Sequence, residues 1–584
     1  MNRVIALFAI GACMSSALAA TPANPNWKQQ FQKVSDEYLD RVYFHYAPTQ
    51  GTLAGYHKYD RQLENYARKD IDAEIAALKD FEQRVTIIPP AALDLTTRGD
   101  RELVRGAIRS TLLTLETIRP WEKNPDGYSS TCAAGTFALM ERKFAPPDDR
   151  LRSLIAREKQ MPALLADARV NLKNPPRIYT QIAIEQLPGI VDFFQHDVPL
   201  AFADAKDPAL QAEFARTNAA VIAALNSYLD WLKADLLARS NGDFRIGADA
   251  FRKKLEYDEM VDLPLDKLLE IGWADLHKNQ EHFKQVAHQL DPSKTPRQVL
   301  EELGQDHPAP GQLLDAFHDT FNSLVSFIQS HHIVTIPSDV RPTVEETPPF
   351  MRATTQASMD TPGPFETHST TAYFNVTLPD KSMMPAEVDG YMHSFNAGTI
   401  VSTAVHEAYP GHYVQFLWVP RAPSRVRKLL GANTDVEGWA HYCEQMMLDE
   451  GYGQPGVGAK DERESRMLRL GQLQDALLRD ARFIAGIAMH TGNMTFDQAV
   501  DFFQKEGYQS KETAVVEAKR GTGDPTYLYY TLGKIEILKL RADMMKKEGE
   551  SFSLEKFHNE FLSQGFPPIK IVREAMLHDD SPAL

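Results

Sequence analysis

The chain has 584 residues, of which 43% are hydrophobic and 24% charged, with 32 glycines and 36 prolines. This composition is typical of a folded globular protein and excludes a collagen-like, coiled-coil or wholly disordered chain. The 63 Lys and Arg residues against 79 Asp and Glu residues give a net charge of −16. Because there is also no long basic run, we expect no nucleic-acid partner.

The first residues have the pattern of a secretory signal peptide. Arg3 precedes an apolar run at 4–12, and Ala17 and Ala19 provide a cleavage site. We therefore assign residues 1–20 to a signal peptide and expect a periplasmic or secreted protein. Cys13 lies in a segment that loosely resembles a bacterial lipobox, so lipid anchoring is the alternative. No later run approaches the roughly 20 apolar residues of a transmembrane helix, and no transmembrane segment is expected.

The sequence from about residue 27 to residue 332 predicts one helix after another. Apolar residues recur at spacings of three and four, for example over 71–85, 151–172 and 210–240, with Pro, Gly or Asn-Pro between the segments. We assign residues 21–332 to a helical N-terminal region that covers the functional cleft.

The composition changes after residue 333. Pro, Thr and β-branched residues become frequent up to residue 395, and residues 371–377 alternate as a strand does. The edge of this strand is a candidate site for an extended peptide. Helical patterning returns after Asn396, with a loop expected at 519–524. The predicted fold is therefore mostly α, a large multi-helix body with a small β-sheet, and residues 333–584 form the catalytic region.

The most informative motif follows an apolar helical segment. His406 and Glu407 are adjacent, and a second histidine, His412, comes directly after Pro410 and Gly411. In the zinc motif HExxH the histidines are four residues apart and share one face of a helix. A spacing of six turns the two imidazoles about 240° apart on a regular helix, so a pair of metal ligands requires a break. Pro410 and Gly411 can supply that break; otherwise the histidines are unrelated.

A second polar group follows 25 residues after the second histidine. Glu437, His441 and Glu444 fall within about 60° of one another on a helix and share one face. They can form a solvated face behind a helix cap at Thr434. However, two histidines, a glutamate and a water form a known catalytic zinc site. Together the two segments favour a metal site.

Residues 406–412 read HEAYPGH and residues 437–444 read EGWAHYCE. Both resemble the signature segments of the bacterial family called domain of unknown function 885, which is grouped with the gluzincin-type zinc peptidases, relatives of thermolysin and carboxypeptidase Taq. Dipeptidyl peptidase III is similar in having an insertion between its motif histidines. The resemblance spans nearly the whole mature chain, and it implies a zincin-like catalytic helix pair within residues 333–584.

The resemblance implies Zn²⁺ as the cofactor, with His406, His412 and Glu437 as its ligands. It also implies that Glu407 is the general base. These roles agree with zinc chemistry, since zinc lowers the pKa of its bound water towards about 7 and a nearby carboxylate can take the proton.

Five further residues are candidates for supporting roles. His441 or Glu444 can orient a metal ligand. Tyr530, together with His490, is a candidate donor to the oxyanion of a tetrahedral intermediate. Arg520 can bind a substrate carboxylate, but we favour an ion pair with the glutamate three residues before it.

The chain departs from the family pattern near its C-terminus. Gly486 stands where Asp is usual and Ala488 where Gly is usual, while Gly521 replaces a Tyr. Thr526 and Tyr527 replace a Gly-Gln pair. These departures bear on substrate preference more than on metal binding.

The sequence therefore predicts a zinc metallopeptidase acting on short or unfolded peptides. One alternative is an amidase-type metallohydrolase on cell-wall peptides or other acyl bonds, which would use the same residues. The other is a non-catalytic peptide-binding protein, against which the intact Glu407 argues, since a binder needs no base beside a metal. The sequence carries no signal of oligomeric state.

Overall fold

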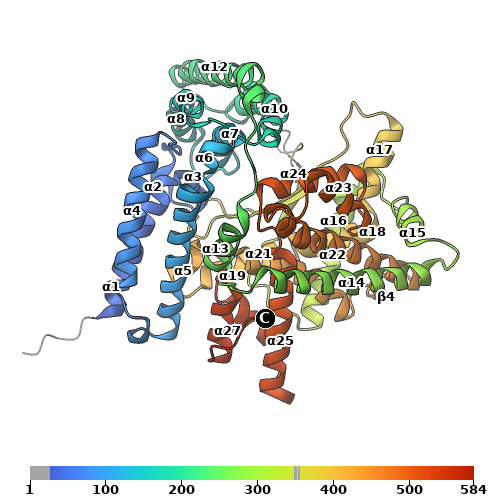
Figure 1. The fold of residues 1–584 in the computed structure, drawn as a ribbon. Coiled ribbons are helices and arrows are strands. Elements are labelled where there is room, and N and C mark those ends of the chain that lie inside the picture. The colour runs from blue at the N-terminus through green and yellow to red at the C-terminus, as the bar shows by residue number, and fades with distance from the viewer. Residues whose placement is uncertain (1–25, 348–351, 353–354) are drawn as a thin grey trace, which may run out of the picture.

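The computed structural model describes residues 26–347, 352 and 355–584, so the predicted signal peptide and Cys13 lie outside the described residues. Most of the described chain is helical, with one three-stranded and one two-stranded sheet (Figure 1). The prediction of a mostly α protein with a small sheet is confirmed. Among the described residues, no helix combines the length and apolarity needed to cross a membrane.

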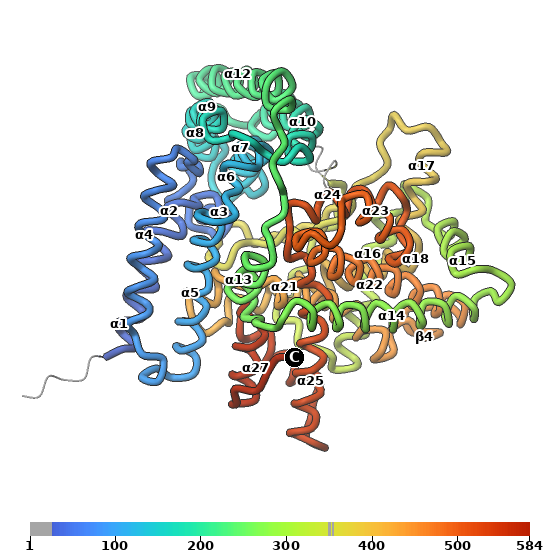
Figure 2. The backbone as a smooth tube through the Cα atoms, in the orientation of Figure 1, coloured from blue at the N-terminus to red at the C-terminus, as the bar shows by residue number. Residues whose placement is uncertain are grey.

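A first run of helices fills the left and upper parts of the molecule (Figures 1 and 2). One hydrophobic core lies within residues 63–236, and a second gathers residues 31–112 together with Val426, Leu430 and Ile571 from much later in the chain. The helices are α1 (Trp27–Tyr38), α2 (Phe44–Tyr46), α3 (Pro48–Leu53), α4 (Arg68–Thr86), α5 (Leu95–Leu113), α6 (Pro120–Lys123), α7 (Asp126–Met140), α8 (Pro147–Glu158), α9 (Met161–Asn171), α10 (Arg177–Asp192), α11 (Val198–Ala201) and α12 (Pro208–Trp231).

Two of the predicted helices differ in detail. The single helix expected over 151–172 is two helices, because α8 ends at Glu158 and α9 starts at Met161 with Pro162 in its first turn. Proline has no N–H to donate and is well tolerated in the first turn of a helix. The helix expected over 210–240 is α12 followed by short π and 3₁₀ turns that end at Arg239.

The middle of the chain crosses to the right-hand part of the molecule in Figure 1. The division was predicted near residue 333, but α13, α14 and α15 already share cores with the later helix that begins at Glu462. The elements are α13 (Gly247–Glu259), α14 (Leu265–Leu290), α15 (Pro296–Leu303), α16 (Leu313–Ser330), β1 (Thr343–Glu346), β2 (Ala357–Asp360), β3 (Tyr373–Val376), α17 (Pro385–Met392), α18 (Ala397–Glu407), α19 (His412–Trp418), α20 (Arg425–Leu429) and α21 (Asn433–Asp449).

The strand predicted over 371–377 is β3, which lies in the centre of the three-stranded sheet. It pairs in parallel with β1 and antiparallel with β2. Both of its edges are therefore hydrogen-bonded, and the prediction that this strand offers an edge to a peptide is wrong.

The last part of the chain completes the body around α18 and α21. Packing of α21 on α25, of α14 on α22, and of α18 on both α21 and α22 joins these helices. The prediction of a loop at 519–524 is wrong, since α24 continues to Gly523. The elements are β4 (Gln454–Pro455), β5 (Gly458–Ala459), α22 (Glu462–His490), α23 (Phe496–Lys505), α24 (Lys511–Gly523), α25 (Tyr529–Glu548), α26 (Leu554–Leu562) and α27 (Ile569–Leu577).

Candidate metal centre

The helix carrying the first histidine stops where the sequence predicted a break. α18 ends at Glu407 and α19 begins at His412. Between them the backbone N–H of Gly411 donates to the carbonyl of Val405 at 2.9 Å, which folds the chain back onto the last turn of α18. A Cβ at residue 411 would lie 1.8 Å from the carbonyl oxygen of His406. Only glycine fits this fold-back.

The fold-back brings the two histidines together with a glutamate from α21. Ligand atoms of His406, His412 and Glu437 all lie within 4.8 Å of one another. Glu437 Oε2 is 3.4 Å from Nε2 of His406 and 3.5 Å from Nε2 of His412. The two imidazole planes are nearly perpendicular, with their centroids 4.9 Å apart. Three potential ligands from three helices therefore face one point.

These separations fit a zinc ion. A tetrahedral zinc with ligands about 2.0–2.1 Å away sets neighbouring ligand atoms about 3.3 Å apart. The Glu437 Oε2 atom is buried and has no hydrogen-bond partner in the described part of the chain. A buried carboxylate oxygen without a donor is costly, and a cation held between it and the two imidazoles would satisfy it.

Glu444 holds the other side of the first histidine. Its Oε1 atom lies 2.7 Å from Nδ1 of His406, and its Oε2 atom lies 3.3 Å from Nδ1 of His441. A carboxylate can only accept, so Nδ1 of His406 carries a proton and donates it to Glu444, which leaves Nε2 as the atom that faces Glu437. Of the two predicted orienting residues, Glu444 contacts the histidine directly and His441 contacts Glu444.

Burial and neighbouring charges shift the pKa values of His406, His441 and Glu444. Burial lowers the pKa of His441 to about 4, so its imidazole is neutral near pH 7. Burial alone would raise the pKa of Glu444, but the adjacent Arg479 guanidinium holds it well below its usual range. Burial would lower the pKa of His406, yet its contacts with Glu437 and Glu444 raise it to about 10. The position of His406 between two carboxylates therefore favours positive charge there.

Sequence reasoning missed the residues that anchor Glu444. Arg479 on α22 contacts Glu444 Oε1 at 3.2 Å and Asp475 at 3.5 Å. Asp475 in turn accepts a 2.6 Å hydrogen bond from Ser402, which lies on α18 one turn before His406. The network therefore links α18, α21 and α22. The available signal was a pair of opposite charges four residues apart on one helix, Asp475 and Arg479.

Tyr530 and Arg520 lie beside the predicted ligands. The rings of Tyr530 and His406 are 6.3 Å apart and nearly parallel. Arg520 donates to the hydroxyl oxygen of Tyr530 at 3.2 Å and to that of Tyr529 at 3.3 Å. The predicted pair of Arg520 with Glu517 is wrong, because Glu517 binds Arg482 through both oxygens, at 2.6 and 2.8 Å.

His490 makes its hydrogen bonds with two backbone groups. Its Nε2 lies 2.8 Å from the carbonyl oxygen of Gly521, and the N–H of Ile246 donates to its Nδ1 at 3.4 Å. A carbonyl only accepts, so Nε2 carries the proton and donates it there. His490 then has no donor left for an oxyanion, which corrects the predicted catalytic role to a packing role.

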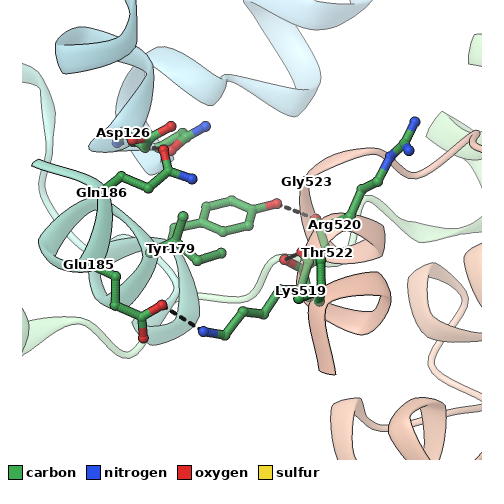
Figure 3. A pocket seen from close by; sticks show the side chains of 11 residues that line it. Asp126, Tyr179, Glu185, Gln186, Lys519, Arg520, Thr522 and Gly523 are labelled. Carbon is green, nitrogen blue, oxygen red and sulfur yellow. Dashed lines mark hydrogen bonds and ion pairs between the residues drawn. The ribbon is translucent and has the colours of Figure 1, made fainter. Parts of the chain in front are cut away.

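A cavity of about 530 Å³ opens next to Arg520. Figure 3 shows side chains of α10 facing those of α24 across it. Lys519 and Glu185 form an ion pair of 2.6 Å, and the Tyr179 hydroxyl donates to the carbonyl of Thr522 (Figure 3). The N-terminal helices thus form one wall of a cavity whose other wall carries Arg520, the residue bonded to Tyr530.

The sequence matches a known protein family, and the fold resembles two solved structures. A sequence model of the family described as "Bacterial protein of unknown function (DUF885)" matches residues 48–576. The chain belongs to this family. No protein in the curated set matches the chain.

Two solved structures resemble this member of DUF885. One, from Shewanella oneidensis, is described as a "putative lipoprotein of unknown function" and is 27% identical, with a TM-score of 0.77 over 94% of this chain and 99% of that chain. The other is a "putative lipoprotein" from Colwellia psychrerythraea, 18% identical, with a TM-score of 0.78 over 94% of this chain and 99% of that chain. The second likeness is one of fold alone.

Three of the residues that we took from the sequence as departures from the family pattern meet at one place. A Cβ at Gly486 would lie 2.9 Å from the ring of Tyr527, and a Cβ at Gly521 would lie 2.3 Å from its hydroxyl. The fully buried Tyr527 ring therefore fills the space that side chains at both positions would need. The absence of side chains at the two glycines therefore leaves the space that the Tyr527 ring occupies. These three residues are separate from the predicted ligands.

Proposed function

We propose that the protein is a zinc-dependent hydrolase that cleaves peptide bonds of short or unfolded peptides and is related to the gluzincin-type peptidases. The observation that carries the proposal is the convergence of three potential ligands. Glu437 Oε2 lies 3.4 Å from His406 Nε2 and 3.5 Å from His412 Nε2. Two histidines and a carboxylate form the ligand set of catalytic zinc in known peptidases.

A bound zinc ion would act as a Lewis acid and lower the pKa of its water towards about 7. Glu407 follows His406 at the end of α18 and is partly exposed, and its carboxylate would serve as the general base. Glu444 keeps the proton of His406 on Nδ1 and leaves Nε2 as the ligand atom.

Tyr530 is the proposed oxyanion donor. Its hydroxyl oxygen accepts from Arg520, and the described part of the chain offers no acceptor for its own proton. Tyr529 differs, because its hydroxyl donates to Asp524 at 2.8 Å. The Tyr530 hydroxyl can therefore donate to a substrate oxygen as negative charge develops there, while Arg520 holds it in place.

The proposed location is outside the cytoplasm. The predicted signal peptide and the lipoprotein names of the two similar structures support an exported enzyme. In that compartment the substrates would be short peptides that enter the cavity between α10 and α24.

The ligand assignment is tested by the zinc content of the mature protein and of His412→Ala, measured after dialysis. We expect His412→Ala to retain one zinc equivalent fewer than the parent and to lose hydrolysis of peptides. His490→Gln is the matched control, since His490 is equally buried but bonded only to backbone groups, and it should keep the parent's zinc content. Full zinc content and activity in His412→Ala would overturn the assignment.

A further inference from the structure

A second group of two histidines and a carboxylate lies away from the proposed catalytic site. His307, Asp389 and His393 offer ligand atoms that all lie within 4.8 Å of one another. His307 Nε2 is 3.5 Å from Asp389 Oδ1, and His393 Nε2 is 3.4 Å from Asp389 Oδ2. Each carboxylate oxygen therefore faces one imidazole nitrogen.

The fold brings these residues together from two segments. Asp389 is in α17, and His393 follows one turn later at the end of that helix. His307 comes from the connection after α15. Gly304, which ends α15, allows the close approach, because a Cβ there would lie 3.1 Å from Cβ of His393. The His393 side chain thus packs closely against Gly304 at the end of α15.

A backbone carbonyl fixes the tautomer of His307. Its Nδ1 lies 2.9 Å from the carbonyl oxygen of Pro308. A carbonyl only accepts, so Nδ1 carries the proton and Nε2 presents a lone pair towards Asp389. Metal-binding histidines are typically held in this way, with one ring nitrogen donating to a carbonyl or carboxylate.

The spacing of the three side chains suits a metal site. Both separations exceed the usual length of about 2.9–3.0 Å for a hydrogen bond between nitrogen and oxygen. Ligand atoms around a tetrahedral zinc are about 3.3 Å apart. Asp389 is 67% exposed and His307 14% exposed, so the group opens to solvent on the side of the carboxylate, where water can complete a coordination shell.

We propose that His307 Nε2, His393 Nε2 and the Asp389 carboxylate bind a divalent first-row transition-metal ion, with zinc as the preferred occupant. Imidazole and carboxylate ligands suit zinc, copper and nickel. The ion ties the connection after α15 to the end of α17. Three residues after His393, Asn396 caps α18 through hydrogen bonds of 3.0 and 3.2 Å to Gly398 and Thr399, so the ion also fixes the start of the helix that carries His406.

The test is a zinc-binding titration of the metal-free mature protein at pH 7.5, followed by calorimetry. His307→Ala and Asp389→Asn should each bind one equivalent fewer than the parent. Asp389→Asn keeps the size of an exposed side chain, so loss of folding cannot explain its result. The matched control is His196→Ala, because His196 contacts Asp192 at 2.8 Å with the same spacing of four residues, and it should leave the stoichiometry unchanged.

A variant without the two histidines of the proposed catalytic site distinguishes zinc bound there from zinc bound at His307. In His406→Ala/His412→Ala, one equivalent should remain and disappear when His307→Ala is added. If the catalytic proposal fails, the parent alone should already show this single, His307-dependent equivalent. The surface site is overturned if His307→Ala binds as much zinc as the parent, or if His196→Ala loses as much as His307→Ala.

Discussion

The two groups of paired histidines in this protein have almost the same nitrogen–oxygen separations and very different surroundings. In both, a carboxylate lies 3.4 and 3.5 Å from two imidazole nitrogens. His406 is 7% exposed and has Glu444 behind its second nitrogen. The Asp389 group is open to water and has one backbone carbonyl behind His307. Both groups are therefore proposed metal sites, and the buried carboxylates, arginines and tyrosine are the features that favour a catalytic role for the first group alone.

A third group, formed by His57, Asp60 and Glu366, is an ordinary set of ion pairs in the same fold. His57 lies 3.0 Å from Glu366 and 3.2 Å from Asp60, both at hydrogen-bonding distance. The other oxygen of Glu366 already accepts from the backbone N–H groups of His368 and Ser369. The carboxylate is satisfied without a cation, so this group joins the N-terminal helices to the segment before β3 and does not need a metal.

The largest effect is expected from the proposed base. Glu407→Gln should lower the rate of peptide hydrolysis by at least about 100-fold, because general-base catalysis contributes that much or more, while the zinc content stays at the parent's value. Kinetics and metal analysis of the same sample check both parts. Glu462→Gln, on the exposed surface of α22, should behave as the parent. Activity of Glu407→Gln near the parent's would exclude Glu407 as the base.

Tyr530→Phe should lower kcat by about 100-fold with little change in KM, which is typical of a lost oxyanion donor. Steady-state kinetics on one peptide measures both constants. Tyr529→Phe is the matched control, since its hydroxyl contacts the same arginine but gives its proton to Asp524, and it should keep most of the activity. Equal kcat values for the two variants would remove Tyr530 from the mechanism.

Glu444→Gln should weaken zinc binding at the buried group by about 10–100-fold, because an amide carries no negative charge behind His406. Competition with a chelator of known affinity measures the change. Asp100→Asn also removes a buried carboxylate from an arginine, at 2.7 Å from Arg427, and controls for stability. If both variants bind zinc as the parent does, the supporting role of Glu444 is wrong.

The smallest effect concerns the ion pair at His57. Burial lowers the pKa of His57, but hydrogen bonds to Asp60 and Glu366 raise it above its usual value overall. A raised folded-state pKa stabilises the fold fully below the unfolded value near 6.5, and this stabilisation is lost as the pH rises through the folded value. His57→Gln should therefore cost up to about 1 kcal/mol at pH 5.5 and less at pH 9.

Urea unfolding at the two pH values measures this cost, with the exposed His368→Gln as control. An equal cost at both pH values would contradict the ion-pair account. The zinc stoichiometry of His57→Gln should equal that of the parent; a lost equivalent would make this group a metal site as well.

Local features of the sequence predicted the centre of the candidate site. The break at Pro410 and Gly411 was readable because helix geometry and residue chemistry act over a few residues. The shared face of Glu437 and Glu444 followed from helical periodicity. The mostly α fold and the position of β3 were likewise local properties of composition and alternation.

The errors in side-chain contacts and in the position of β3 involve other segments of the chain, whereas the errors in helix limits, such as the loop expected at 519–524, are local. Glu517 pairs with Arg482, 35 residues away, rather than with Arg520. His490 is tied to Ile246, 244 residues away. The central position of β3 depends on two strands that precede it, separated by a long connection. Such contacts are decided by tertiary packing, and no pattern within one segment specifies them.

The most direct test of the central claim is a mass-spectrometric digest of a diverse peptide mixture by the mature protein in three states: zinc-loaded, treated with a chelator, and restored with zinc. Glu407→Gln runs beside them. The account predicts cleavage that disappears with the chelator, returns with zinc and is absent in the variant. No cleavage by the zinc-loaded protein, or cleavage that persists without metal and without Glu407, would contradict it.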